Sequence, residues 1–513
     1  MARLLGALLA ITLGLAGPAR ATAPGAHTDI APPSSALDAE RANLAAAFAK
    51  QQNNDASGAL ALLKVVVASP QFDALESAQR HYALFVLGAD LIDAGEFSAA
   101  FASLKTATGM KETAGLDWHL RLRAASEVGD TRDALLSLTT IAEKWPLTLD
   151  QVRDAYVIDL NRRAGKDKTL DDPRFELQSA LAKAHWTPTD ATLDGDSVWL
   201  DFIRASVGRG DIQQATAASE MLVEPESIIR LRIVKAYDPV TRSNPARYDV
   251  QSAMTRQLAR RKAASAADPH NLELINQVGY ELLDQNRAAD ALNLADAVLA
   301  RAKPKDGGKS DITDLSKLNW TYDNRSRALV ALGRGDEAVT QLMLGARRPE
   351  NGGLNVSQAL NLAQLLEDQG RAAEALTQIA AVDGEAMSPY GRLDMEGVRV
   401  CALAETADQS ALGVSLKFVR DHADDAPGWL QDAYICLGDL DNAARTLVTR
   451  LTDPKSRDDA LFEIQDFAVP SGTPLLVRAR ARRLAAVRNR PEVRVAIDAF
   501  GRVESFPVIG PGR

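Results

Sequence analysis

Apolar residues recur along this chain at the three-to-four-residue spacing of an amphipathic helix. In Leu84–Ala107, the sequence LFVLGADLIDAGEFSAAFASLKTA carries one apolar helical face, a break at Ala94-Gly95-Glu96 and then a second helix. This pattern predicts two antiparallel helices joined by a short turn. Related patterns recur from Leu37 almost to the end of the chain, which predicts an all-α protein.

The turns follow a fixed period. Gly95 and Gly129 lie 34 residues apart, and Gly370 and Gly438 lie 68 apart, which is twice 34 with a degenerate turn between them. Two longer spacings, Gly165 to Gly210 and Asn286 to Gly333, are explained by polar inserts at Thr187–Asp196 and Lys303–Asp314. A chain of 513 residues also exceeds the size at which one globular core stops growing, so a repeat array is expected.

The same large and small apolar positions recur within the period. The first hairpin has Leu84, Leu87-Gly88, Leu91, Ala100 and Leu104, and the next has Trp118, Ala125, Ala134, Leu138 and Pro146, although Arg121 and Leu122 replace the Leu-Gly pair. Later hairpins have Ile275, Val278-Gly279, Leu282 and Ala291; Tyr322, Leu329, Ala338 and Leu342; Leu362-Ala363, Leu366, Gly370 and Ala375; and Leu430, Tyr434, Gly438-Asp439, Ala443 and Leu447. This pattern resembles the tetratricopeptide repeat.

The resemblance implies an α-solenoid superhelix of stacked antiparallel helix pairs. About twelve pairs are expected if the weaker segments Leu149–His185 and Glu226–Asp268 are included. Related α-solenoid repeats remain the competing assignment. Small residues such as Gly88 and Ala100 should let the two helices of a pair approach closely.

The two ends of the chain differ from the array. Arg3, the uncharged apolar run Leu4–Leu15 and the Ala19-Arg20-Ala21 site predict a signal peptide over residues 1–21, cleaved after Ala21. A Pro-rich leader at 22–36 precedes the array at 37–455, and residues 456–513 are expected to form short capping helices. No Cys follows the apolar run for a lipid anchor and no later run is long enough to cross a membrane, so we expect export to the periplasm.

Charge is unevenly distributed. The net charge is −9, but Ser471–Arg513 carries nine Arg and three acidic residues, or +6, against −15 elsewhere. The first interpretation is an amphipathic capping helix with a solvated basic face. The alternative is a docking patch for anionic lipid, polysaccharide or an acidic partner. The negative overall charge argues against general nucleic-acid binding.

Cys401 and Cys436 are the only two cysteines, and they lie 35 residues apart on what we interpret as the first helices of adjacent pairs. A disulfide is sterically conceivable there. The offset of one residue from a whole repeat rotates the side chains by roughly 100°, so free buried thiols are the expectation.

Catalytic and cofactor motifs are absent from the sequence. The six His residues lack metal-ligand spacing, and no nucleophile elbow, Walker loop or dinucleotide-binding motif occurs. We therefore expect no enzyme activity, metal or cofactor. Asp424-Asp425 and Asp458-Asp459 are assigned to helix N-termini, where carboxylates complement the macrodipole.

The remaining candidates for function are surface positions. In tetratricopeptide superhelices the first helix of each pair lines a concave groove, which implies protein or peptide ligands. By that resemblance the partner-binding candidates are Asn276, Tyr280, Asp284, Asp323, Arg327, Gln364 and Glu367, with Trp320 as an aromatic anchor near the polar insert and Tyr322 in the core. The resulting hypothesis is a non-enzymatic periplasmic scaffold that binds protein partners in envelope assembly or export. The alternative is a surface-associated adaptor that binds anionic polysaccharide or lipid through the basic C-terminal segment.

Overall fold

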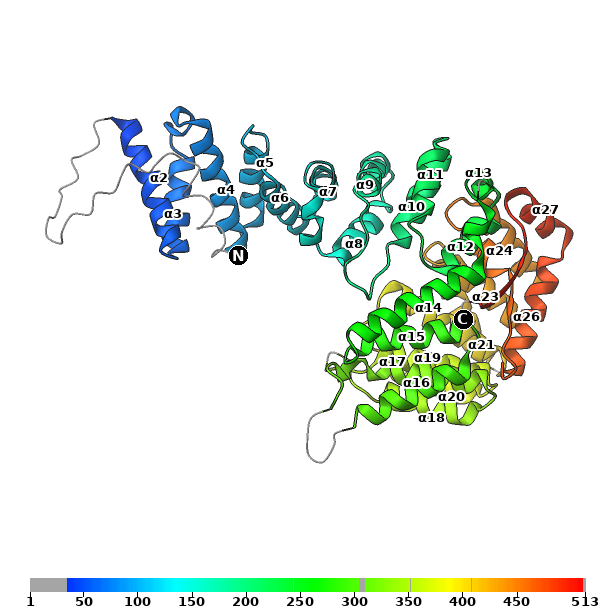
Figure 1. The fold of residues 1–513 in the computed structure, drawn as a ribbon. Helices are drawn as coiled ribbons and strands as arrows, with labels where there is room; N and C mark the ends of the chain where they lie inside the picture. The colour runs from blue at the N-terminus through cyan, green and yellow to red at the C-terminus, as the bar shows by residue number, and fades with distance from the viewer. Residues whose placement is uncertain (1–34, 243, 304–309, 351, 407, 511–513) are drawn as a thin grey trace. The chain divides into compact units, whose positions relative to one another are not determined.

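The computed structural model describes residues 35–242, 244–303, 310–350, 352–406 and 408–510, so the predicted signal peptide lies outside the described residues. The chain forms two compact units, Met1–Trp186 and Thr187–Arg513. Helices dominate both units, as the sequence predicts (Figure 1).

The first unit is built from four helix pairs in its described part. They are α2 (Ala36–Gln52) with α3 (Ala56–Val67), α4 (Ser77–Asp93) with α5 (Phe97–Thr108), α6 (Gly115–Glu127) with α7 (Thr131–Lys144), and α8 (Asp154–Ala164) with α9 (Asp171–Lys183). Short 3-10 turns lie at Phe72–Ala74, Pro146–Gln151 and Lys168–Leu170. Each pair stacks on the next, because one pair cannot bury its own apolar face.

The second unit contains six pairs in its described part. They are α10 (Asp196–Gly208) with α11 (Ile212–Ser219), α15 (Leu272–Asp284) with α16 (Ala288–Arg301), α17 (Leu318–Ala331) with α18 (Gly335–Ala346), α19 (Val356–Asp368) with α20 (Ala372–Val382), α21 (Pro389–Ala404) with α22 (Gln409–Asp421), and α23 (Pro427–Leu437) with α24 (Leu440–Thr452). The described chain thus has ten pairs and not about twelve.

The difference arises partly at Glu226–Asp268, which interrupts the regular pairs. It forms α12 (Pro225–Ile233), a one-turn helix α13 (Asp238–Thr241) and the long α14 (Val250–Ala267), with 3-10 turns at Lys235–Tyr237 and Pro245–Tyr248. Pro239 and Pro245 break this stretch because proline cannot donate the backbone hydrogen bond that a helix interior requires.

The predicted turn glycines end the first helix of a pair in the left-handed conformation. Gly95 has φ of +77°, its N–H donates to Ile92 O at 3.1 Å, and the Glu96 N–H donates to Leu91 O at 2.8 Å. These two bonds satisfy carbonyls that the helix end would otherwise leave unpaired. Asn54 and Asn286 take the same conformation, whereas Gly165 has φ of −64° and does not belong to this series.

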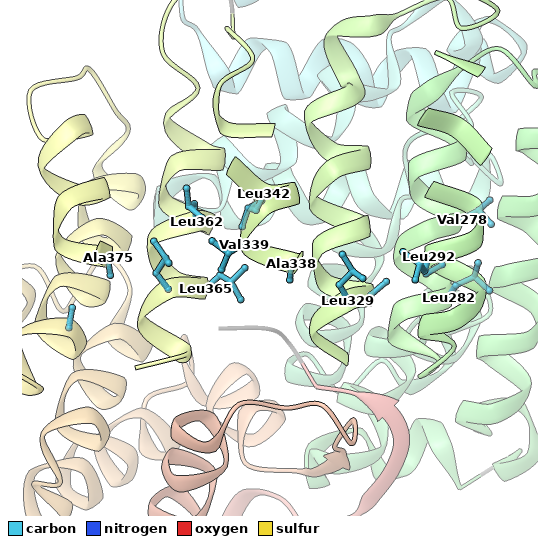
Figure 2. Packing of buried hydrophobic residues seen from close by; sticks show 14 of the residues in the cluster. Val278, Leu282, Leu292, Leu329, Ala338, Val339, Leu342, Leu362, Leu365 and Ala375 are labelled. Carbon is cyan, nitrogen blue, oxygen red and sulfur yellow. The ribbon is translucent and has the colours of Figure 1, made fainter. Parts of the chain in front are cut away.

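The cores follow the repeat positions. In the first unit Ala100 is fully buried between helices, as predicted. In the second unit one cluster runs from α14 to α21 and includes Val278, Leu282, Leu329 and Leu362 (Figure 2). Small residues alternate with large ones here, so neighbouring helices pack closely.

Arg121, which departs from the repeat pattern, is buried and bridges three helices of the first unit. Its Nε donates to Asp133 Oδ1 at 2.7 Å, and its Nη1 donates to Thr108 Oγ1 at 2.7 Å. A buried guanidinium requires such partners to offset the loss of water. The departure therefore replaces an apolar contact with a polar link between α5, α6 and α7.

Cys401 in α21 and Cys436 in α23 form a disulfide, with Cα atoms 5.2 Å apart. The sequence-based expectation of free thiols is wrong. Identical positions in stacked repeats point in the same direction and so cannot face each other. An offset from a whole repeat rotates one side chain toward its neighbour, and the one-residue offset therefore favours the bridge.

The C-terminal segment returns across the second unit. It contains α25 (Arg457–Glu463), β1 (Asp466–Ala468), α26 (Leu475–Arg488), α27 (Pro491–Phe500) and β2 (Ser505–Ile509). The two strands pair in parallel, with Asp466 opposite Ser505, a small sheet that the helical pattern did not predict. Asp458 and Asp459 lie in the first turn of α25, where Asp458 also accepts from Tyr237 at 2.8 Å and pairs with Arg204 at 3.0 Å. The C-terminal segment thus joins the last repeat to α10 and α12 (Figure 1).

Candidate partner-binding surface

Three of the predicted partner-binding residues come together on α15 and α17. The guanidinium of Arg327 lies 5.9 Å from the ring centroid of Tyr280, and Asp284 is one helical turn beyond Tyr280 on α15. Arg327 also pairs through Nε with Asp323 Oδ2 at 2.8 Å. The side chain of Arg327 remains about half exposed, so it can still be reached by a ligand. We call Tyr280, Asp284 and Arg327 the inner patch.

The electrostatics of the inner patch are unusual for an accessible surface. Loss of water, followed by the nearby charges of Glu281 and Glu226, raises the pKa of the Asp284 carboxyl to about 7. Burial and the charge of Asp323 also raise the pKa of the Tyr280 hydroxyl. Asp284 is nevertheless exposed. A cationic or hydrogen-bond-donating ligand at Asp284 would therefore stabilise the charged form of a carboxyl that loss of water and the charges of Glu281 and Glu226 disfavour.

Three other predicted positions are buried and do not fit a role in contacting a partner. Asn276 is 3% exposed and packs between α15 and α17, where its Oδ1 accepts from Thr321 Oγ1 at 2.8 Å. Asp323 is 2% exposed and accepts from Asn361 Nδ2 at 3.2 Å. Glu367 is fully buried and contacts Arg480. These side chains lie on the first helices as expected, but their helical phase turns them toward neighbouring helices.

The remaining candidates are half-buried. Gln364 donates to Asp368 Oδ1 at 3.1 Å, so its amide is already engaged within α19. Trp320 is half-buried at the start of α17, and Tyr322 packs against a core cluster, as the sequence predicts. None of these three joins the inner patch through a contact in the described residues.

Most arginines of the basic C-terminal segment contact the protein itself. Arg480 pairs with Glu367 and Asp368, Arg488 with Asp466, Arg490 with Asp441, and Arg502 with Asp238, while Arg478 and Arg483 donate to backbone carbonyls. Among the described residues, only Arg482 and Arg494 of this segment show no such partner. The predicted solvated basic face therefore has far fewer free cations than its sequence indicates.

The described residues contain no group of three or more His, Cys, Asp or Glu side chains placed to hold a metal ion. None of their helices has the length and apolar character needed to span a membrane. A cleft of about 490 Å³ lies at the start of α23, lined among others by Trp429, Asp432 and Asp459. Acidic side chains outnumber basic ones in its lining, and Tyr390, which also lines it, is 63% exposed.

No family model and no curated protein matches this sequence. Solved structures do resemble it. A tetratricopeptide repeat protein from Parabacteroides merdae is 11% identical, with 64% of this chain and 98% of that chain covered and a TM-score of 0.26. The Cut9–Hcn1 hetero-tetramer of the APC/C is also 11% identical, with 91% and 96% covered and a TM-score of 0.28. The P58(IPK) TPR domain is 13% identical, with 79% and 98% covered and a TM-score of 0.17.

The chain has a tetratricopeptide-like fold. Its helix pairs, their 34-residue spacing and the left-handed residues that end the first helices establish this fold.

The sequence did not predict the polar contacts between α19 and the C-terminal segment. Asp368 ends α19 beside Glu367, and both meet Arg480 from more than a hundred positions later in the chain. The available signal was the pair Arg480 and Arg483, which lie three residues apart on one helical face. Nothing in the repeat period connects that face with α19.

Proposed function

We propose that this protein is an exported, non-enzymatic scaffold that binds a protein partner through the inner patch of its second unit. The supporting observation is the exposed carboxylate of Asp284 beside Tyr280 and Arg327 on the first helices of two adjacent pairs. An aromatic ring next to a cation and an anion offers stacking and charge-assisted hydrogen bonds to one peptide segment. The predicted signal peptide supports a role in envelope assembly or export.

Site-specific photo-crosslinking in the full-length chain tests the binding role. A photoreactive phenylalanine replaces Tyr280, and a matched one replaces Asp336, whose side chain is fully exposed on α18 and distant in sequence. One partner should crosslink at position 280 and not at 336, and Arg327→Ala should reduce its yield at least tenfold. Equal crosslinking at both positions, or insensitivity to Arg327→Ala, would reject the inner patch as the binding site.

Cell fractionation and N-terminal sequencing test the export. The expected mature protein begins at Thr22 and is found in the periplasmic fraction. An uncleaved chain that is recovered in the cytosol and crosslinks to cytosolic proteins would reject the envelope role. The crosslinking test of the inner patch does not depend on that result.

A further inference from the structure

Helix α26 lies along the row of turns that join the two helices of successive pairs. Gly472 donates from its N–H to Ala331 O at 3.1 Å at the end of α17, and a Cβ on Gly472 would lie 2.1 Å from Gly333 N. Leu476 approaches Gly370, and Arg483 approaches Gly438. The helix therefore follows the ends of α17, α19 and α23 in order, and we call it the edge helix.

Two arginines supply the polar contacts of the edge helix to α19 and α23, and Arg488 at its end pairs with Asp466 next to α25. Arg480 inserts between the carboxylates of Glu367 and Asp368, and its Nη1 lies 3.0 Å from Asp368 Oδ1. Arg483 Nη1 donates to Ile435 O at 2.9 Å and to Cys436 O at 2.8 Å. These carbonyls belong to the last turn of α23, where the helix dipole is negative, so a cation is favoured there.

The receiving surface is built to hold a cation. Glu367 is fully buried, and its Oε2 has no hydrogen-bond partner although its Oε1 meets Arg480. Burial raises the pKa of the Glu367 carboxyl, so a guanidinium or ammonium group beside it is what stabilises the charged form here. Arg480 therefore binds only one of the two carboxylate oxygens of Glu367.

The edge helix buries fewer apolar side chains than the following helix, α27. Val487 is its only fully buried residue, and Leu475 at its start is 82% exposed. The following helix, α27, buries Val493, Ala496 and Ile497 over a shorter length. Docking of α26 therefore depends mainly on polar contacts, made by Arg480, Arg483 and Arg488, and on the close approach of Gly472, whereas α27 is anchored by its core.

We propose that the surface under the edge helix is a second partner site, and that its ligand is a helix with two arginines three residues apart. In the free protein α26 occupies this site in cis, and the partner helix replaces it through the same contacts to Glu367, Asp368 and the end of α23. The proposal rests on the scaffold role inferred above, but it uses residues outside the inner patch.

The probe is a labelled synthetic peptide with the sequence Thr473–Arg490, added to full-length protein. Two variants free the site in different ways: Gly472→Leu creates a steric clash with the α17–α18 turn, and Arg480→Gln with Arg483→Gln removes the polar contacts to α19 and α23. Hydrogen exchange over residues 475–488 confirms release. We expect the peptide to bind both variants at least tenfold more tightly than it binds the wild type.

Control peptides and a control protein variant test whether binding depends on the two arginines and the two carboxylates. A peptide with Arg482→Gln should bind as well as the parent, because Arg482 is exposed and unpartnered among the described residues. A peptide with Arg480→Gln and Arg483→Gln should not bind. Adding Glu367→Gln and Asp368→Asn to the Gly472→Leu protein should weaken binding at least tenfold.

Three results would overturn the proposal. Equal binding to wild type and released variants would show that α26 does not occupy the site, and no binding to variants whose α26 is released would show that the site does not accept a helix in trans. A dimer held by exchanged α26 segments, detected by light scattering, would assign the site to a second copy. Crosslinking at Tyr280 is independent of all three, so failure here is distinguishable from failure of the scaffold role.

Discussion

Gly88 of α4 lies directly against Leu104 of α5, so closely that a Cβ on Gly88 would be 2.5 Å from Leu104 Cγ. Leu104 is fully buried, and the core around it includes Ala100 and Leu91. The pair shows why the repeat alternates small and large residues: the absent Cβ is the space into which the leucine packs.

We expect Gly88→Ala to lower the free energy of unfolding by about 1–3 kcal/mol, because the added carbon displaces Leu104 from its packed position. Urea unfolding followed by circular dichroism measures the effect. Gly208→Ala in α10 is the control, because no atom lies within 4 Å of the added Cβ. The free energy of unfolding of this variant should equal or exceed that of the wild type, since Ala is favoured over Gly within a helix. A Gly88→Ala protein as stable as the control would contradict the close packing.

At the turn glycine Gly95 the constraint is conformational and not steric. No atom lies within 4 Å of a Cβ placed there, but φ is +77°. We expect Gly95→Ala to cost about 1 kcal/mol and Gly95→Asn to cost less, because Asn tolerates the left-handed region, as Asn54 and Asn286 do here. Urea midpoints of both variants should be compared with that of Gly413→Ala, which has equally open space within α22. Identical costs for Ala and Asn would contradict this explanation.

The raised pKa of Asp284 should make stability depend on pH. Its folded-state pKa is about 7 against an ordinary value of 3.8, so the folded state binds more protons between these values, and its contribution to the free energy of unfolding falls as pH rises. Asp284→Asn should therefore stabilise the protein more at pH 8 than at pH 4.5, measured by thermal unfolding. Asp336→Asn, at a fully exposed carboxylate, serves as the control and should show a smaller difference. An Asp284→Asn effect that is equal at both pH values would contradict the raised pKa of Asp284.

The Cys401–Cys436 bridge should leave no reactive thiol in denatured, unreduced protein and two after reduction. Replacing both cysteines by serine should destabilise the folded state by roughly 3–4 kcal/mol in the chain-entropy model for a loop of this length. Thiol titration and urea unfolding provide the two measurements. Two reactive thiols before reduction would restore the expectation of free cysteines.

The amino-acid sequence alone was sufficient to predict the helix pairs, their period and the small positions between them. Each depends on interactions within about one repeat: the 3.6-residue period places Leu84 and Leu91 on one face, and Gly95 ends a helix wherever a left-handed residue is needed. Because the repeats are equivalent, the sequence also predicted that Tyr280 and Arg327 would lie on neighbouring first helices.

Only the tertiary structure decided which side chains meet between repeats and across the second unit. Asn276 and Glu367 belong to the expected helices, yet a small difference in helical phase buries them. The Cys401–Cys436 pair and the contact of Arg480 with Glu367 depend on how small rotations accumulate from one repeat to the next. The period in the sequence specifies how one repeat packs on the next, but it does not specify the total rotation over many repeats. That total rotation determines which repeats the C-terminal segment contacts.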